Sequence, residues 1–303
     1  SFIQITGRAQ YKVNSLRYTA TMKIPERLKP LIEDGIIDDV LRQLKSGKEA
    51  AVYLVQRGEH VRCAKVYKEV ERRSFRQAAE YTEGRKSRNS RRARAMEKGS
   101  RYGKQEQEAA WQTAEADALY RLSAVGMRVP RTYGFFEGVL LMDVIEDADG
   151  QPAPRLNDVL FSADEARQHH TTLIQEVVRM LCAGLVHGDL SEFNILLAAD
   201  GPIIIDFPQA VDAAQNNHAA SLLERDVQNL ADFFGRFAPE LLETRYGKEI
   251  WSLYAKGELT PETALTGRFA DSTKKADVRG VLREIDAAIK EEMQRRERMQ
   301  EQE

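Results

Sequence analysis

The residues best suited to chemistry lie in two short strings, LVHGDLSEFNIL at 185–196 and IIIDFPQAV at 203–211. Asp189 and Asn194 are five residues apart in the first string, and Asp206 follows three isoleucines in the second. A carboxylate can accept a proton from a hydroxyl group, and carboxylate and carboxamide oxygens are ligands for Mg²⁺. An isolated Asp at the end of a strand is more often a cap or a surface charge. The conjunction of all three residues is therefore what indicates a site.

The spacing of these residues resembles the catalytic and metal-binding loops of the protein-kinase superfamily. In that superfamily a D-x-x-x-x-N string supplies an Asp that orients or deprotonates the acceptor hydroxyl and an Asn that holds a metal ion, and a further Asp ligates metal at the DFG position. The resemblance implies Asp189 as the proton acceptor, and Asn194 and Asp206 as ligands of the Mg²⁺ that accompanies ATP. His187 is expected to be structural rather than to titrate during catalysis.

Two further residues are expected to anchor the phosphates. Lys65 lies in the strand-like run VRCAKVYK, and a lysine among apolar neighbours costs free energy unless an anion receives it. In a kinase the strand Lys reaches the α- and β-phosphates, and a Glu on the following helix pairs with it. Glu115, in WQTAEADAL, is the predicted partner, and Glu108 is the alternative.

The elements that must position Lys65 and Glu115 are a sheet and one helix. Apolar alternation interrupted by SGK and RGE turn signals predicts three antiparallel strands between residues 38 and 68. Apolar residues on one side of the run EQEAAWQTAEADALYRLSAVGM predict a helix that ends near Gly126. VPRTYGFFEGVLLMDVI predicts two more strands, and a short helix near 27–33 precedes the sheet.

The second half of the chain is predicted to be mainly helical. Ser162 and Glu165 have the spacing of a capping box, which predicts the start of a long helix. Residues 203–207 are predicted as a brief buried strand, and 221–238 and 278–299 as amphipathic helices. The predicted fold class is therefore α+β, in two lobes: a five-stranded antiparallel sheet with one helix, followed by a helical lobe.

Several strings are similar to those of the RIO family of atypical protein serine kinases. They are SGKEAAVY, AKVYK, PAPRL, HGDLSEFNIL, IDFPQAV and ERDVQNLADFF, and the resemblance extends over roughly residues 38 to 240. Pro208 stands in place of the usual DFG glycine, and Gly47 is the only glycine of the shortened phosphate loop. The resemblance implies a two-lobed kinase with a protein-kinase-like fold that binds ATP and Mg²⁺ between its lobes. The same oxygen ligands accept Mn²⁺.

The resemblance also assigns roles around the nucleotide. Ser46 is expected to place its hydroxyl on the phosphates beside Gly47. In LLMDVI, backbone groups of Asp143 and Ile145 are expected to hold the adenine, and Met142 is expected to line its pocket.

Four segments follow from these assignments. They are an N-terminal extension at 1–37, a kinase N-lobe at 38–145, a kinase C-lobe at 146–290 and a charged tail at 291–303. Within the N-lobe, residues 72–104 hold twelve Lys/Arg against three Glu although the whole chain has a net charge of -2, and this segment is predicted to be a mobile basic loop. Its serines, Ser87, Ser90 and Ser100, are candidate autophosphorylation sites. The loop is suited to RNA, a ribosomal subunit or another acidic partner, and a solvated insertion without a partner is the alternative.

The predicted function is that of an ATP-dependent serine/threonine protein kinase that also phosphorylates itself. One alternative is an ATPase switch that binds RNA or a ribosome-assembly intermediate, with Asp206 accepting phosphate as an aspartyl intermediate. The other is a small-molecule phosphotransferase of the aminoglycoside or choline kinase type, which also has an HGD-x-x-x-x-N loop. Pro208, the SGKEA turn and the basic segment argue against this last alternative.

Composition limits the setting. In 303 residues, no apolar run approaches the roughly 18 needed to cross a bilayer, and no N-terminal string resembles a secretory signal. Cys63 and Cys182 are too few for a disulfide framework and lack the spacing of a zinc site. We expect a cytoplasmic protein with no membrane partner. Without a recognisable winged helix or a long Lys-rich tail, the chain is expected to resemble the bacterial branch of the family.

Overall fold

The structure is a computed structural model that describes residues 23–68 and 101–270, with the side chains of 101–112 left aside. It divides into two units, Ser1–Arg268 and Phe269–Glu303, and everything below concerns the first. Residues 72–100 of the predicted basic loop, the predicted helix at 278–299 and the predicted tail lie outside the described residues. None of the helices within the described ranges combines the length and hydrophobicity that a membrane span requires.

The first part of this unit is built on a five-stranded antiparallel sheet, as predicted. Its strands are β1 (Asp39–Ser46), β2 (Ala50–Arg57), β3 (His60–Tyr67), β4 (Thr132–Phe136) and β5 (Val139–Asp143). Their spatial order is β1-β2-β3-β5-β4, which makes β3, the strand of Lys65, the central one. Glu137 and Gly138 join β4 to β5 with φ angles of 43° and 88°, as a tight two-residue hairpin turn requires.

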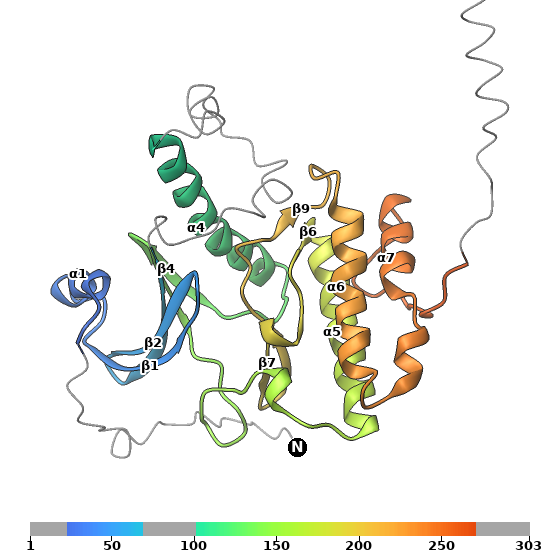
Figure 1. Ribbon diagram of the computed structural model, residues 1–303, viewed down its shortest axis with the longest axis horizontal. Helices are drawn as coiled ribbons and strands as arrows, with labels where there is room; N and C mark the ends of the chain where they lie inside the picture. The colour runs from blue at the N-terminus through green and yellow to red at the C-terminus, as the bar shows by residue number, and fades with distance from the viewer. Residues whose placement is uncertain (1–22, 69–100, 271–303) are drawn as a thin grey trace, which may run out of the picture. The chain divides into compact units, whose positions relative to one another are not determined.

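Two helices pack against the sheet. The short helix α1 (Lys29–Glu33) follows a 3₁₀ turn (Glu26–Leu28), and Leu31 of the helix and Leu28 of the turn pack against the sheet, which confirms the predicted N-terminal helix. Helix α4 (Arg101–Ala124) runs beside the sheet (Figure 1). It begins four residues before the end of the predicted basic loop, because Arg101–Lys104 continue the helical run that follows them. Its described core face includes Leu119 and Leu122.

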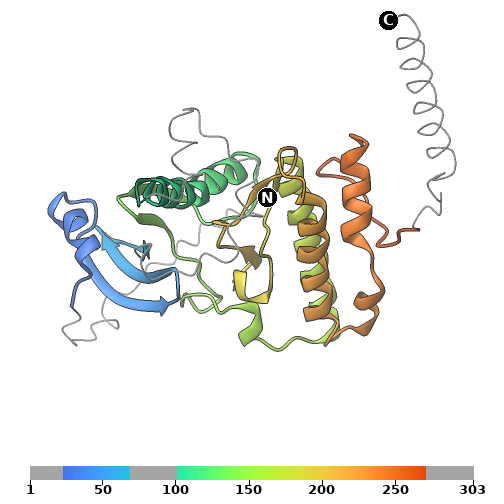
Figure 2. The same ribbon diagram turned by 45° about the horizontal axis from the view of Figure 1, so that its top comes forward.

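The second part is mainly helical, as predicted. Its long helices are α5 (Ala163–Cys182), α6 (Ala219–Phe234) and α7 (Tyr246–Ala255). Ser162 and Glu165 form the predicted capping box of α5. Helices α5 and α6 lie side by side and α7 packs against both (Figure 2).

Short elements connect these helices. The strands are β6 (Leu185–Val186), β7 (Ile195–Ala198), β8 (Gly201–Ile204) and β9 (Val211–Asp212), paired as β6-β9 and β7-β8. The 3₁₀ helices are η4 (Leu156–Asp158), η5 (Glu192–Asn194) and η6 (Pro239–Glu243). The strand predicted at 203–207 is β8, which starts two residues earlier and ends before Asp206. Asp206 has a φ of 72°, which breaks the extended backbone.

One hydrophobic core joins the sheet to the helices. It includes Tyr67 of β3, Leu119 of α4, Leu140 of β5, Leu173 of α5 and Leu230 of α6. The elements that carry the predicted site residues are therefore held by common packing rather than by loops alone.

Candidate active site

A cavity of about 340 Å³ lies where the sheet, α4 and the β7–β8 region meet. Six of the residues predicted from sequence line it: Lys65, Glu115, Met142, Asp143, Ile145 and Asp206. The same lining contains three charged residues that were not predicted as site residues: Lys45, Arg155 and Asp158. Residues from positions 44 to 206 thus enclose one space.

Lys65 lies at the centre of the charged cluster in this cavity. Its Nζ is 2.8 Å from both carboxylate oxygens of Glu115 and 2.5 Å from Oδ1 of Asp206. Burial alone would lower the pKa of Lys65, but the two carboxylates hold that pKa well above its ordinary value. Lys65 is therefore a cation, and Glu115 occupies the position of its helix partner.

Tyr67 supports Glu115, a role that the sequence argument missed. Its hydroxyl donates a hydrogen bond to Oε2 of Glu115, and its side chain is 1% exposed. Burial raises the pKa of Tyr67, so the hydroxyl stays protonated and remains a donor. The signal was present in the sequence, because residues two apart on a strand point to the same face.

Asp206 presents its carboxylate to the cavity two residues beyond the end of β8. Burial tends to raise the pKa of Asp206, but the Lys65 ammonium outweighs it and holds the pKa below the usual range. The Asp206 side chain is 38% exposed, and its Oδ1 is the atom bound to Lys65. The carboxylate is thus ionised and accessible.

Asp189 and Asn194 are brought together by the loop between β6 and β7. Nδ2 of Asn194 donates to the backbone carbonyl of Asp189 at 2.8 Å and lies 3.4 Å from its Oδ2. Partial burial and the negative charge of Asp206 raise the pKa of Asp189. A raised pKa makes this carboxylate a better proton acceptor when it is ionised.

Helix α6 holds the loop that carries Asp189, which the sequence argument also missed. The buried carboxylate of Asp226 accepts hydrogen bonds from the backbone N–H of Gly188 at 2.7 Å and of Leu190 at 3.0 Å. Arg225 donates to the carbonyl of Gly188. Burial raises the pKa of Asp226 to about 7. The backbone on both sides of Asp189 is therefore tied to one rigid helix.

His187 is placed as a structural residue. It is fully buried, its Nε2 lies 3.1 Å from the carbonyl oxygen of Ile205, and its ring centroid is 4.9 Å from that of Phe207. Burial lowers the pKa of His187 to about 4. The imidazole is neutral at pH 7 and links the loop of Asp189 to that of Asp206.

The predicted phosphate loop lies apart from the cavity lining. Ser46 ends β1 and Gly47 begins the turn to β2; neither is among the residues that line the cavity, whereas Lys45 is. Nζ of Lys68 is 3.4 Å from Oγ of Ser46 and 2.5 Å from the carbonyl oxygen of Gly47. Lys68 therefore hydrogen-bonds to this turn. Contact of Ser46 and Gly47 with phosphates stays a prediction.

The segment expected to hold adenine does line the cavity. The backbone N–H of Asp143 donates to the carbonyl of Arg131 at 2.9 Å, and the carbonyl of Ile145 accepts from Ala153 at 2.8 Å. These bonds engage one backbone group of each residue. The carbonyl of Asp143 and the N–H of Ile145 are the remaining candidates for contact with a base.

The oxygen donors fit a magnesium ion. Mg²⁺ is commonly held by one or two protein oxygens together with substrate phosphates. Because Nδ2 of Asn194 bonds to Asp189, its Oδ1 is the atom that remains for a cation. The backbone carbonyl of Asn194 accepts from the N–H of Ile205, the residue before Asp206, at 2.9 Å. Within the described residues no group of three or more His, Cys, Asp or Glu side chains could hold a metal alone. Two protein oxygens would leave the other coordination positions to water and phosphate oxygens.

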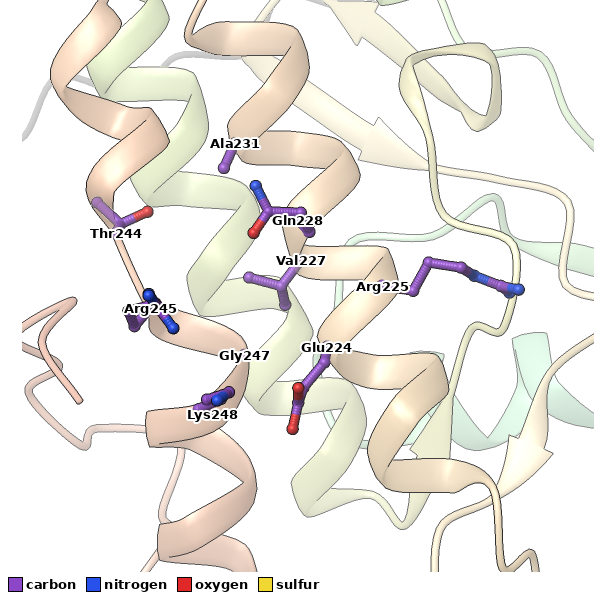
Figure 3. A pocket seen from close by; sticks show the side chains of 9 residues that line it. All are labelled: Glu224, Arg225, Val227, Gln228, Ala231, Thr244, Arg245, Gly247 and Lys248. Atoms are coloured by element: carbon purple, nitrogen blue, oxygen red, sulfur yellow. The ribbon is translucent and has the colours of Figure 1, made fainter. Parts of the chain in front are cut away.

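A second cavity, of about 300 Å³, lies between α6 and the start of α7. Figure 3 shows that Arg225 leaves α6 on the side away from Arg245 and Lys248. Its guanidinium is the group bonded to the carbonyl of Gly188. None of the residues predicted from sequence as site residues lines this cavity.

Comparison with known proteins decides the family. A family model described as the RIO domain matches residues 51–246. The chain belongs to the RIO family. It is 34% identical over 208 residues to the RIO-type serine/threonine-protein kinase Rio1 of Haloferax volcanii, covering 68% of this chain and 67% of that protein.

The chain is also similar to other RIO-type kinases. The chain is 34% identical to Rio1 of Methanocaldococcus jannaschii, covering 64% of this chain and 62% of that protein. It is 33% identical to the serine/threonine-protein kinase RIO1 of Homo sapiens, covering 71% of this chain and 36% of that protein. The match thus spans between about a third and two thirds of the length of these relatives. They are archaeal and eukaryotic, and the resemblance to a bacterial branch stays a prediction.

A solved structure confirms the kinase-like α+β fold. It is the crystal structure of the Rio2 kinase-ADP/Mg2+-phosphoaspartate complex from Chaetomium thermophilum. The match has a TM-score of 0.53 and 22% sequence identity, and it covers 88% of this chain and 75% of that one. This RIO chain therefore has the fold that the sequence predicted.

Proposed function

We propose that this RIO chain is an ATP-dependent protein kinase that transfers the γ-phosphoryl group to serine or threonine, including serines of its own chain. The observation that carries the proposal is the cluster in which Lys65 bonds to Glu115 and Asp206 in one cavity. Packing does not explain the two buried charged groups Lys65 and Glu115 at a cavity wall, because each loses hydration there. The names of the RIO relatives support the same activity. We also propose lobe boundaries at 38–145 and 146–290.

Each residue has one task in this proposal. Lys65, held by Glu115, binds the α- and β-phosphates, while Asp206 and Oδ1 of Asn194 hold the divalent cation. Bound ATP and Mg²⁺ supply the phosphoryl group and the positive charge that offsets its oxygens. Asp189 accepts the proton of the acceptor hydroxyl, with its raised pKa as support.

The nucleotide base is expected to lie against the segment after β5. The carbonyl of Asp143 accepts a hydrogen bond from the exocyclic amine of adenine, and the N–H of Ile145 donates to a ring nitrogen. Met142 supplies apolar contact. Ser46 and Gly47 lie outside the lining of the cavity, as do Asp189 and Asn194, and the contact of Ser46 and Gly47 with the phosphates is part of the proposal.

Incubation with γ-labelled ATP and Mg²⁺ tests the proposal. The wild type is expected to give acid-stable label on serine or threonine. Asp189→Ala and Asp206→Asn are expected to lose it while keeping the thermal unfolding of the wild type. Absence of acid-stable label on any protein or peptide would overturn the kinase assignment.

A second candidate is an ATPase switch in which Asp206 takes up phosphate. It is favoured by the accessible carboxylate of Asp206 and by the phosphoaspartate in the Chaetomium relative. An oxygen of Asp206 would attack the γ-phosphorus and ADP would leave, after which water would release phosphate. Acid-labile, hydroxylamine-sensitive label on Asp206, with release of free phosphate, would favour this function over the first.

The setting and the macromolecular partner are further proposals. The basic segment at 72–104 supports binding to RNA or a ribosomal subunit, which a steep loss of affinity with rising salt would test. Two free cysteines, Cys63 and Cys182, support a cytoplasmic location. No observation favours the aminoglycoside or choline kinase alternative, and the relatives reported above are protein kinases.

A further inference from the structure

Phe193 is an exposed aromatic residue in the loop that carries Asp189. Its exposed fraction is 50%, and within the described ranges it takes part in no ring or cation–π contact. A single exposed phenylalanine needs no explanation by itself. Its position does call for one, because η5 lies between Asp189 and the start of β7 and ends at Asn194.

Both neighbours of Phe193 are fixed. Asn194 is buried and donates from Nδ2 to the carbonyl of Asp189 at 2.8 Å. The Glu192 side chain is 14% exposed, and its Oε1 lies 3.6 Å from a guanidinium nitrogen of Arg236. Because η5 is held on both sides, the backbone of Phe193 has a defined position beside Asp189.

The proposed chemistry brings a substrate chain to this place. A hydroxyl that gives its proton to Asp189 must come within about 3 Å of that carboxylate. An extended chain advances about 3.3 Å per residue. Phe193 lies in the same short loop, next to the Asn194 that bonds to Asp189, so a substrate residue about one to three positions from the acceptor is the one expected to meet it.

We propose that Phe193 is the docking platform for an apolar side chain of the protein substrate, close in sequence to the acceptor serine or threonine. This inference rests on the proposed kinase function. An aliphatic or aromatic residue placed on the ring removes apolar area of both partners from water. A charged residue at the same position would lose hydration without gaining a partner.

Peptide selectivity tests the proposal. The wild type, Phe193→Ala and Phe193→Arg are compared on arrayed serine peptides in which each flanking position is varied. Leu242→Ala is the matched control, because Leu242 is 49% exposed and lies in η6. The wild type is expected to favour apolar residues at one flanking position by about tenfold. Phe193→Ala is expected to lose most of that preference, and Phe193→Arg to transfer it to Asp and Glu.

The arginine variant separates docking from a structural role, because loss of structure cannot create a preference for acidic residues. Unchanged selectivity in both variants of an active enzyme overturns the proposal and leaves the kinase function standing. If the wild type phosphorylates neither itself nor any peptide, both the docking proposal and the kinase function are wrong. If both variants fail to give a cooperative thermal transition, the ring is covered by the chain itself and the proposal is wrong. Autophosphorylation without any peptide phosphorylation also overturns it.

Discussion

Replacing Tyr67 with Phe tests whether the buried cluster around Lys65 is held as described. The substitution removes only the hydroxyl that donates to Oε2 of Glu115. The ring, which lies 6.1 Å from that of Phe135, keeps its packing. Glu115 retains two contacts to Lys65 but loses the neutral donor.

The magnitude follows from the charge of the acceptor. A hydrogen bond to an ionised group contributes about 1.5–3 kcal/mol, and Tyr67 is too buried for water to replace it. We expect Tyr67→Phe to lower the free energy of unfolding by about 2 kcal/mol. For a domain of this size that corresponds to a decrease in Tm of roughly 4–8 °C.

Urea unfolding at pH 7, followed by circular dichroism, measures the change. Tyr53→Phe is the matched control, because Tyr53 lies half-buried on the adjacent strand β2 and its hydroxyl has no hydrogen bond to any described residue. The control should shift the unfolding free energy by less than about 0.5 kcal/mol. Equal effects of the two substitutions would refute the role assigned to the Tyr67 hydroxyl.

Two further predictions concern buried titratable groups. His170 is buried, burial lowers its pKa to about 4, and its Nε2 has no partner among the described residues. The unfolded chain therefore binds more protons between pH 4 and 6.5, so stability falls on acidification, by about 2 kcal/mol from pH 6.5 to 5 for this group. His170→Phe should remove that part of the pH dependence of urea unfolding, and an unchanged slope would contradict the assignment. Asp226→Asn should cost about 2–4 kcal/mol and lower kcat more than ADP affinity, because it turns an acceptor of two backbone N–H groups into a partial donor. Calorimetric ADP titration measures the affinity, and labelled-ATP kinetics measure kcat. If Asp226 acted on the nucleotide, ADP affinity would fall more than kcat.

The residues that touch the proposed reaction were predictable from sequence because their spacing is local. Asp189 and Asn194 lie in one loop, and alternation in VRCAKVYK placed Lys65 on a strand. The five strands and the capping box of α5 also followed from local patterns, since period, turn residues and caps act over a few positions. Glu115 required a tertiary pairing across fifty residues, and the prediction kept Glu108 open beside it.

The supporting residues were missed because their signals are not local. Asp226 and Arg225 act on Gly188 from almost forty residues away, and on a helix pattern they are ordinary polar positions. Lys45 lines the cavity from β1, but in the local pattern it is one of several polar positions on that strand. The strand before Asp206 was predicted to end too late, at 207. The positive φ of Asp206 ends the extended backbone earlier, and a positive φ at a non-glycine residue has no sequence signature.

The bonds of Lys65 imply that metal and nucleotide bind together. All three hydrogen bonds of its ammonium go to Glu115 and Asp206, so a phosphate must displace Asp206 to reach Lys65. Without Mg²⁺ the displaced carboxylate would face phosphate oxygens, and two like charges at about 4 Å repel by a few kcal/mol near a protein surface. We expect the wild type to bind ADP at least tenfold more weakly in EDTA than in Mg²⁺. Asp206→Asn should bind ADP more tightly than the wild type in EDTA and more weakly in Mg²⁺. Titration of a fluorescent ADP analogue measures both affinities, and wild-type binding that is independent of Mg²⁺ would show that Asp206 does not compete for Lys65.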